Sequence, residues 1–120
     1  MNLSEHFDEE EFLCRHCGRG HGLIDPVLVR GLERLRAMIG RPVQLTNAYR
    51  CAEHNRQVGG VEQSYHTQGK AADIFVIGLT ALELAQLCER IPEFHNGGIG
   101  TYPAKKMVHV DTGVRRRWRG

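Results

Sequence analysis

The segment at residues 71–77, AADIFVI, constrains the fold more than any other part of the sequence. Small, aliphatic and aromatic residues make up most of it, which is typical of a strand buried in a sheet. Asp73 is the one charged residue inside this run. A carboxylate at such a position is costly unless a cation, a hydrogen-bond donor or a metal ion pairs with it. We therefore expect a fold in which a partner reaches Asp73.

Two helices are predicted as the cover of the core. Asp25-Pro26 marks the start of the first, because Asp is a favourable N-cap and proline is tolerated in the first turn. Gly40 marks its end. The capping box Thr80-Ala-Leu-Glu83 opens the second helix, which ends before Pro92. The apolar residues at helical spacing are Leu28, Leu32, Leu35 and Ile39 in the first helix and Leu84, Leu87, Cys88 and Ile91 in the second.

Further strands are predicted on both sides of the 71–77 run. Alternation over residues 43–47 indicates a strand that turns Val43 and Leu45 toward the core. Residues 98–102 and 107–111 indicate two short strands joined by a turn. A short helix is predicted between Cys51 and Val58, followed by a polar loop that ends at His66. Together these elements predict an α+β fold, a small antiparallel sheet covered by helices.

A chain of 120 residues is the length of one domain, predicted here over residues 25–120, after an N-terminal arm over residues 1–24. No run approaches the roughly 18 apolar residues of a membrane helix, so no membrane span is expected. The acidic start, MNLSEHFDEEEF, lacks the basic and apolar regions of a secretory signal. We therefore expect a chain made in the cytoplasm, with four cysteines that are reduced or bind metal rather than pair in disulfides.

The formal net charge is only +2, but basic residues crowd the last six positions as Arg115, Arg116, Arg117 and Arg119. We interpret this segment as a solvated tail. A nucleic-acid interface needs basic residues spread over a face with aromatic residues between them, and only Trp118 is interleaved here. Nucleic acid is therefore not expected as a partner.

Three residues stand where the pattern predicts burial or a sheet edge and are able to bind a metal ion: His66, Asp73 and His109. Two imidazoles and a carboxylate around a tetrahedral ion leave one position for water, which is the arrangement of a catalytic zinc site. Such an ion lowers the pKa of its water to about 7. Taken singly, Asp73 and His109 are more often structural residues with satisfied hydrogen bonds.

The wider pattern is more specific. Ser64-x-His66-x-x-Gly69-x-Ala71-x-Asp73, preceded by Tyr49-Arg50 and followed by Val108-His109-Val110-Asp111, resembles the zinc D,D-peptidase family over about residues 25–118. That family includes D-alanyl-D-alanine carboxypeptidases, murein endopeptidases and phage endolysins, and its zinc-binding fold is shared with the hedgehog signalling domain. The resemblance implies that His66, from a loop, and Asp73 and His109, from neighbouring strands, bind Zn²⁺. Gly69 and the small Ala71 are expected to let the backbone pass close to the metal.

Arg50 matches a family arginine that contacts the carboxylate of the substrate or the carbonyl under attack. A guanidinium offers a planar fork of donors that a lysine does not reproduce. The alternative is a strand-end arginine paired with Glu53 or Glu62. Ser64 and Tyr102 are further expected substrate-binding residues.

The general base is the point where the sequence departs from the family. Many relatives place Glu or Asp three residues before the final ligand, and here that position is Lys106. Asp111 lies two residues beyond His109, on the same face of an extended strand, so it is expected either to act as the base or to hold a ligand's free ring nitrogen. The alternatives for the base are Glu53, Glu62, His54 and His95.

Cys14-Arg-His-Cys17 in the arm is half of a metal site, which His21 or Cys51 would complete. The same pair is also compatible with a redox couple, inert thiols or a clamp that fixes the arm beside Cys51. Cys88, on a helix stripe, is interpreted as a core residue.

The leading hypothesis is a hydrolase, a zinc metallopeptidase that cuts D-amino-acid-containing stem peptides of peptidoglycan, as a D-Ala-D-Ala carboxypeptidase or a murein D,D-endopeptidase. The rival is a zinc-binding module without catalysis, and a redox or nucleic-acid role ranks third. We expect a monomer whose partner is the stem peptide of the cell wall. Because that substrate lies outside the cytoplasm, a phage or prophage lysis protein, a virion-associated enzyme and a chain trimmed of its signal all remain open.

Overall fold

The computed structural model describes residues 1–60 and 64–120 and confirms the α+β prediction. Its sheet has five strands: β1 (Gln44–Asn47), β2 (Ala71–Phe75), β3 (Gly98–Tyr102), β4 (Met107–Asp111) and β5 (Arg116–Arg119). They are ordered β1-β2-β4-β3-β5, with β3 and β5 parallel and the other neighbours antiparallel. The helices are α1 (Pro26–Ile39), α2 (Ala52–Gln57), α3 (Ala81–Cys88) and α4 (Pro92–His95), with short 3-10 turns η1 (Glu9–Phe12), η2 (Tyr65–Gln68) and η3 (Pro103–Lys105).

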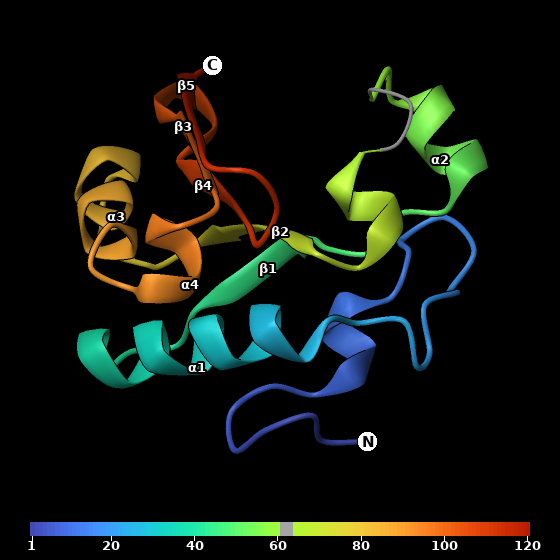
Figure 1. The fold of residues 1–120 in the computed structure, drawn as a ribbon, viewed down its shortest axis with the longest axis horizontal. Helices are drawn as coiled ribbons and strands as arrows, with labels where there is room; N and C mark the ends of the chain where they lie inside the picture. The colour runs from blue at the N-terminus through green and yellow to red at the C-terminus, as the bar shows by residue number, and fades with distance from the viewer. Residues whose placement is uncertain (61–63) are drawn as a thin grey trace.

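The two faces of the sheet have different roles. Side chains alternate along a strand, so each strand sends every second residue to the same face. One face packs against α1, α3 and α4 and forms the core (Figure 1). Its strand residues are Ile74, Ile99, Val108 and Val110, all buried. The opposite face carries Asp73 and His109, which are register partners on β2 and β4.

The two predicted helices form with the predicted caps. Asp25 accepts a hydrogen bond from Val27 N at 3.0 Å, and Gly40 ends α1 with φ +73°. Thr80 and Glu83 form both bonds of the capping box that opens α3. However, α3 ends at Cys88 and a separate short helix, α4, begins at Pro92. The residue before a proline avoids helical dihedrals, and Ile91 is extended. None of the helices in the described residues has the length and apolar character that crossing a membrane requires.

The central strands lie where the sequence predicted them. Val43 is buried next to β1 and Leu45 is partly buried, as expected. β2 is shorter than predicted because the chain turns after Phe75, where Leu79 N donates to Val76 O and Ile77 is 71% exposed. The hairpin of β3 and β4 has its predicted bounds.

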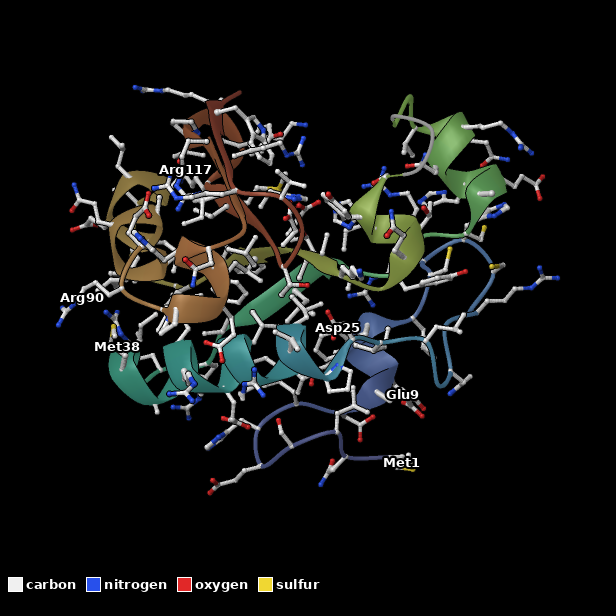
Figure 2. All side chains as sticks on the ribbon, in the orientation of Figure 1. Met1, Glu9, Asp25, Met38, Arg90 and Arg117 are labelled. Atoms are coloured by element: carbon white, nitrogen blue, oxygen red, sulfur yellow. The ribbon has the colours of Figure 1, made fainter. Side chains whose placement is uncertain are left out.

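The prediction of a solvated C-terminal tail was wrong for residues 116–119, which form the edge strand β5 beside β3. Arg117 bonds Glu89 through Nε at 2.7 Å and Nη2 at 2.8 Å, which ties the strand to the residue that follows α3 (Figure 2). On the opposite face, the indole of Trp118 lies over the position where Gly100 has no side chain. These partners are distant in sequence, so the local pattern of arginines did not indicate them.

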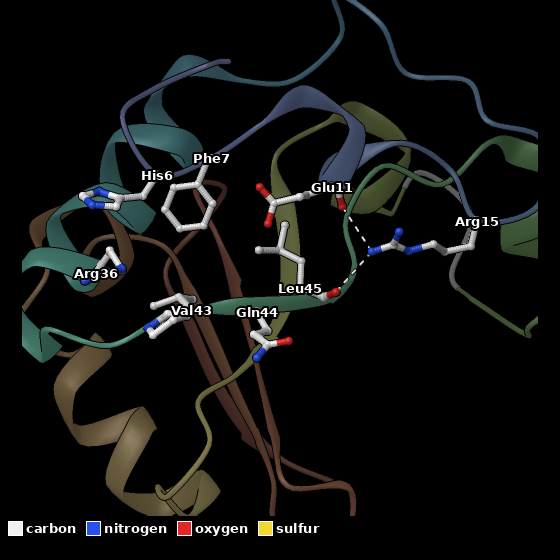
Figure 3. Close-up of a pocket in the computed structure, with 9 residues that line it drawn as sticks. His6, Phe7, Glu11, Arg15, Arg36, Val43, Gln44 and Leu45 are labelled. Atoms are coloured by element: carbon white, nitrogen blue, oxygen red, sulfur yellow. Dashed lines mark hydrogen bonds between the residues drawn. The ribbon is translucent and has the colours of Figure 1, made fainter. Parts of the chain in front are cut away.

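The N-terminal arm is packed onto the domain. Phe7 and Phe12 are buried in the core, and Tyr49 N donates to Phe12 O at 2.9 Å. Figure 3 shows Arg15 donating to the carbonyl oxygens of Glu11 and Leu45 beside a cavity between the arm and β1. Gly69 adopts φ +71° and approaches the carbonyl of Leu23, so its missing side chain makes room for the arm.

Truncation of Phe12 tests whether the arm contributes to the core. Phe12→Ala is expected to lower the free energy of unfolding by about 3–5 kcal/mol, because a fully buried aromatic ring leaves a cavity. Leu82→Ala, at a half-exposed position of α3, is the control and is expected to change it by less than about 1 kcal/mol. Urea unfolding measures both, and equal small effects would show that the arm is an appendage.

Candidate metal centre

The structure brings His66, Asp73 and His109 together on the open face of the sheet. His66 comes from η2, Asp73 from β2 and His109 from β4. Asp73 Oδ1 lies 3.1 Å from His109 Nδ1 and 3.4 Å from His66 Nε2, and the three donor atoms are all within 4.8 Å of one another. Ligands of one tetrahedral ion at 2.0–2.1 Å are about 3.4 Å apart, so the spacing fits a metal ion.

The loop before β2 sets the orientation of His66. Ser64 caps η2, and its Oγ accepts a hydrogen bond from His66 N at 3.1 Å. The imidazole Nδ1 lies 2.8 Å from the carbonyl oxygen of Ala48, which only accepts, so Nδ1 carries the proton. This bond leaves the lone pair of Nε2 for a metal ion.

Asp111 forms a hydrogen bond with the ring nitrogen of His109 that points away from the candidate metal position. Its Oδ2 lies 2.8 Å from His109 Nε2, on the side of the ring opposite the nitrogen that faces Asp73. Asp111 is fully buried, and its Oδ1 accepts from Gly98 N and Gly113 N at 3.0 Å each. Gly98 is required there because a side chain would collide with the carboxylate. Of the two roles predicted for Asp111, this geometry favours positioning the ligand.

The electrostatics of the cluster favour a cation at its centre. Burial acts to raise the pKa of Asp73, but hydrogen bonds and charge from His109 and His66 outweigh burial and hold the pKa well below its usual range. Burial acts to lower the pKa of His109, but Asp111 and Asp73 outweigh it and raise the pKa. Both shifts show that the carboxylates stabilise positive charge at this point, and a divalent ion bound between the three side chains would supply such a charge.

Arg50 lies beside this cluster as a buried cation braced by neutral side chains. Its Nη1 donates to Asn55 Oδ1 at 2.9 Å. Asn47, with its amide oxygen turned inward, accepts from Nε at 3.2 Å and Nη2 at 2.9 Å. Burial lowers the pKa of Arg50, and the charge of Asp73 partly offsets this. Among residues 1–60 and 64–120 no carboxylate forms an ion pair with it; Glu53 does not pair with it, and Glu62 lies outside the described residues.

The cluster opens into a pocket of about 820 Å³. Apart from the three candidate ligands, the polar and aromatic residues that line it are cationic or able to form hydrogen bonds: Arg50, Ser64, Tyr65, Tyr102, Lys105, Arg116 and Trp118. Trp118 Nε1 donates to the hydroxyl of Tyr102 at 2.7 Å, and the guanidinium of Arg116 stacks 4.9 Å from the indole. The wall of the pocket thus suits an anionic ligand with apolar parts.

Sequence reasoning missed part of this wall. Arg116 and Trp118 were not identified as pocket residues because β5 was not predicted, and Tyr65 of η2 and Lys105 of η3 were also missed. One local signal was available: Gly100 within a strand pattern indicates a close approach, and a Cβ there would meet the indole of Trp118. No sequence pattern indicated that Asn47 and Asn55 bind Arg50, because this role depends on the direction of the Arg50 side chain in the folded protein.

The predicted alternatives for a general base are placed differently. Lys106 lies at the end of η3 with φ +54° and is not among the described residues that line the pocket. Neither are Glu53 and His54 of α2 or His95 of α4, and His95 instead pairs with Glu89. Glu62 lies outside the described residues. Asp73 is the pocket's only described carboxylate.

The cysteines of the arm form a separate group. Cys14 and Cys17 meet Cys51, with their sulfur atoms within 4.8 Å of one another, whereas His21 pairs with Glu9 at 2.7 Å. Burial acts to raise the pKa of Cys14, but backbone hydrogen bonds to its sulfur outweigh burial and lower the pKa to about 7. Cys88 lies in the core, where burial raises the pKa of its thiol.

Comparison with known proteins agrees with this arrangement. The peptidase M15 family model matches residues 5–111, so the chain belongs to the peptidase M15 family, whose members are generally metal-dependent. It is 36% identical over 102 residues to MepK of Escherichia coli K12, named a peptidoglycan L,D-endopeptidase, which covers 79% of this chain and 54% of that protein. It is 33% identical over 105 residues to the probable MepK of Haemophilus influenzae, over 81% of this chain and 55% of that protein. The chain spans about half the length of these relatives, and the family match confirms the resemblance drawn from the sequence.

Substitution of Asp111 separates its two predicted roles. Asp111→Asn removes the charged acceptor behind His109 Nε2, so divalent metal affinity is expected to fall about 10–100-fold. Calorimetric titration of the metal-free protein measures this, with circular dichroism to show that the fold is retained. Glu53→Gln, on an exposed turn of α2, is the control and should leave affinity unchanged. Unchanged affinity in Asp111→Asn together with lost hydrolysis would instead assign Asp111 the role of base.

Proposed function

We propose that this chain is a zinc-dependent endopeptidase that hydrolyses the peptide stems of peptidoglycan. One observation carries the proposal: His66, Asp73 and His109 converge at metal-ligand spacing on the floor of an open, cation-rich pocket. Membership of the peptidase M15 family and the similarity to proteins named peptidoglycan endopeptidases support it.

The donor set fits Zn²⁺. Two imidazole nitrogens and one carboxylate oxygen are ligands that zinc accepts, and three protein ligands leave a coordination position for chemistry. Both imidazoles have their other nitrogen next to an oxygen acceptor, Ala48 O for His66 and Asp111 for His109. Bound zinc would supply a Lewis acid that polarises a peptide carbonyl and lowers the pKa of a water molecule to about 7.

The chain's own residues orient the substrate. Arg50 is held by Asn47 and Asn55, so its guanidinium is preorganised beside the cluster, where we propose that it binds the scissile carbonyl or a neighbouring carboxylate. Ser64 and Tyr102 line the pocket and offer further hydrogen bonds. Stem peptides carry free carboxylates, which the basic side chains of the pocket would bind.

The relatives favour one type of bond. The resemblance seen in the sequence implies a D,D bond or a terminal D-alanine, whereas the matched relatives are named L,D-endopeptidases. We therefore propose a peptide bond between an L and a D residue as the preferred substrate, with D,D bonds as the comparison. The chain would act as a monomer outside the cytoplasm, after export or after release during phage or prophage lysis.

The rival function is a zinc-binding module without catalysis. Lys106 at the position of the family acid favours it, as does the absence of a carboxylate other than Asp73 among the described residues of the pocket. It predicts bound zinc without turnover.

Digestion of purified peptidoglycan and of defined cross-linked stem peptides tests the proposed activity. Wild-type protein loaded with zinc is expected to release products that mass spectrometry assigns to cleavage at L,D bonds. Asp73→Ala is expected to lose zinc binding at this centre and all turnover, while the exposed Glu53→Ala keeps both. Zinc-loaded wild type that cleaves neither L,D nor D,D bonds would favour the non-catalytic module.

Arg50→Lys tests substrate orientation. Lysine keeps the charge but loses the fork of donors, so kcat/KM is expected to fall about 10²-fold or more, mostly in kcat if the carbonyl is the partner. Arg56→Lys, exposed on α2, is the matched control. Steady-state kinetics with a defined stem peptide measures both, and equal activities would exclude the proposed role of Arg50.

A further inference from the structure

Three cysteines meet where the arm reaches the start of α2, and none of them lines the pocket. Cys14 and Cys17 lie in the arm, and Cys51 is the N-cap of α2. Their three sulfur atoms lie within 4.8 Å of one another, and Figure 2 shows sulfur atoms where the arm loop meets the start of α2. Thiolates around one tetrahedral zinc ion, at about 2.3 Å from it, are about 3.8 Å apart. The cluster therefore has the dimensions of a zinc site.

The backbone around Cys14 and Cys17 is shaped to hold a metal. The chain turns back through Cys14-Arg-His-Cys17, and Gly18 closes the turn with φ +71° and a bond from its N–H to Cys14 O at 2.8 Å. A residue with a side chain rarely adopts that conformation. The sulfur atoms also accept backbone hydrogen bonds, from Cys51 N to Cys14 at 3.5 Å and from His54 N to Cys51 at 3.4 Å. Such donors stabilise thiolates, the form that binds metal.

His16 lies next to the three cysteines and is the candidate for the fourth ligand. Its Nδ1 is 4.0 Å from the sulfur of Cys51, but it is not one of the donors that all lie within 4.8 Å of one another, so its exposed side chain would have to turn toward the other two sulfur atoms to complete the site. In the structure the His16 ring is stacked on His54, with centroids 5.4 Å apart and planes 11° from parallel. The sequence alone suggested His21 as one possible completion, but His21 pairs with Glu9.

A disulfide explains the positions of only two of the three cysteines, whereas a metal ion explains all three. An S–S bond of about 2.05 Å joins two sulfur atoms and leaves the third without a partner in the cluster. Three thiolates and an imidazole fill all four positions of a tetrahedral ion, which is the arrangement of a structural site rather than a catalytic one.

We propose that Cys14, Cys17 and Cys51, with His16, bind a structural zinc ion that is separate from the His66–Asp73–His109 centre. The ion would join the arm to the segment that carries Arg50. Cys51 directly follows Arg50, and Tyr49 N already bonds Phe12 O in the arm. The proposed site would therefore fix the backbone from which Arg50 reaches the pocket.

Cobalt substitution distinguishes this site from the histidine centre. Co²⁺ bound by thiolates gives an intense near-ultraviolet charge-transfer band, and the His66–Asp73–His109 centre has no thiolate to produce one. Reduced, metal-free protein of residues 1–120, titrated with Co²⁺, is expected to show this band with one equivalent bound there. Asp73→Ala should keep the band, and so should Cys88→Ala, the control for a cysteine outside the cluster.

Two further variants and the zinc content complete the test. Cys51→Ser is expected to abolish the band, and His16→Ala, at an exposed position, to shift it while the fold is kept. Zinc analysis is expected to give two ions in the wild type and one in Asp73→Ala. The proposal is overturned if the reduced wild type shows no band, if it binds a single zinc ion that Asp73→Ala removes, or if two of Cys14, Cys17 and Cys51 are found joined in a disulfide in the purified protein. Peptidoglycan hydrolysis is measured separately, so the result of the cobalt and zinc experiments neither supports nor contradicts the proposed peptidase activity.

Discussion

The carboxylate of Asp73, buried in the middle of the sheet, is the constraint on which the rest of the site depends. A charge in that position needs compensation, and two imidazoles from different parts of the chain provide it. Meeting that need fixes the register of β2 against β4, because Asp73 and His109 must be partners, and it fixes the loop that carries His66. The same three side chains then present their donor atoms to a common point, so the feature that stabilises the fold also builds the candidate metal centre.

Room for this centre comes from side chains that are absent. Gly98 and Gly100 on β3 share the site face with His109 and Asp111, and a Cβ at either would collide with Asp111 or Trp118. Their small size lets a buried carboxylate stand behind one ligand and an indole lie 5.0 Å from its ring. The other face of the same strands is filled with aliphatic residues and packs on the helices. One face of the sheet therefore packs in the hydrophobic core, and the other face carries the candidate metal centre.

Sequence patterns predicted the parts of the structure that depend on interactions between residues close together in the chain. The caps of α1 and α3, the β3–β4 hairpin and the burial of Asp73 followed from sequence, and the family resemblance supplied the three ligands as a set. Sequence patterns did not predict the parts of the structure that depend on a partner far away in the chain. Arg117 pairs with Glu89, which follows α3, and Arg50 is held by Asn47 and Asn55, with no carboxylate paired to it among residues 1–60 and 64–120. Phe7 and Phe12 join the core only because the arm folds back over β1, which no periodicity within the arm reveals.

This chain of the peptidase M15 family combines three candidate metal ligands with a cationic pocket. We propose that the open face of the sheet holds a metal ion between His66, Asp73 and His109. Anomalous diffraction at the zinc absorption edge, from crystals of protein purified without chelators, tests this most directly. The account predicts an anomalous peak within about 2.0–2.2 Å of His66 Nε2, His109 Nδ1 and an oxygen of Asp73. Density that shows the three side chains in contact with one another and no peak between them, in crystals supplied with zinc, would contradict it.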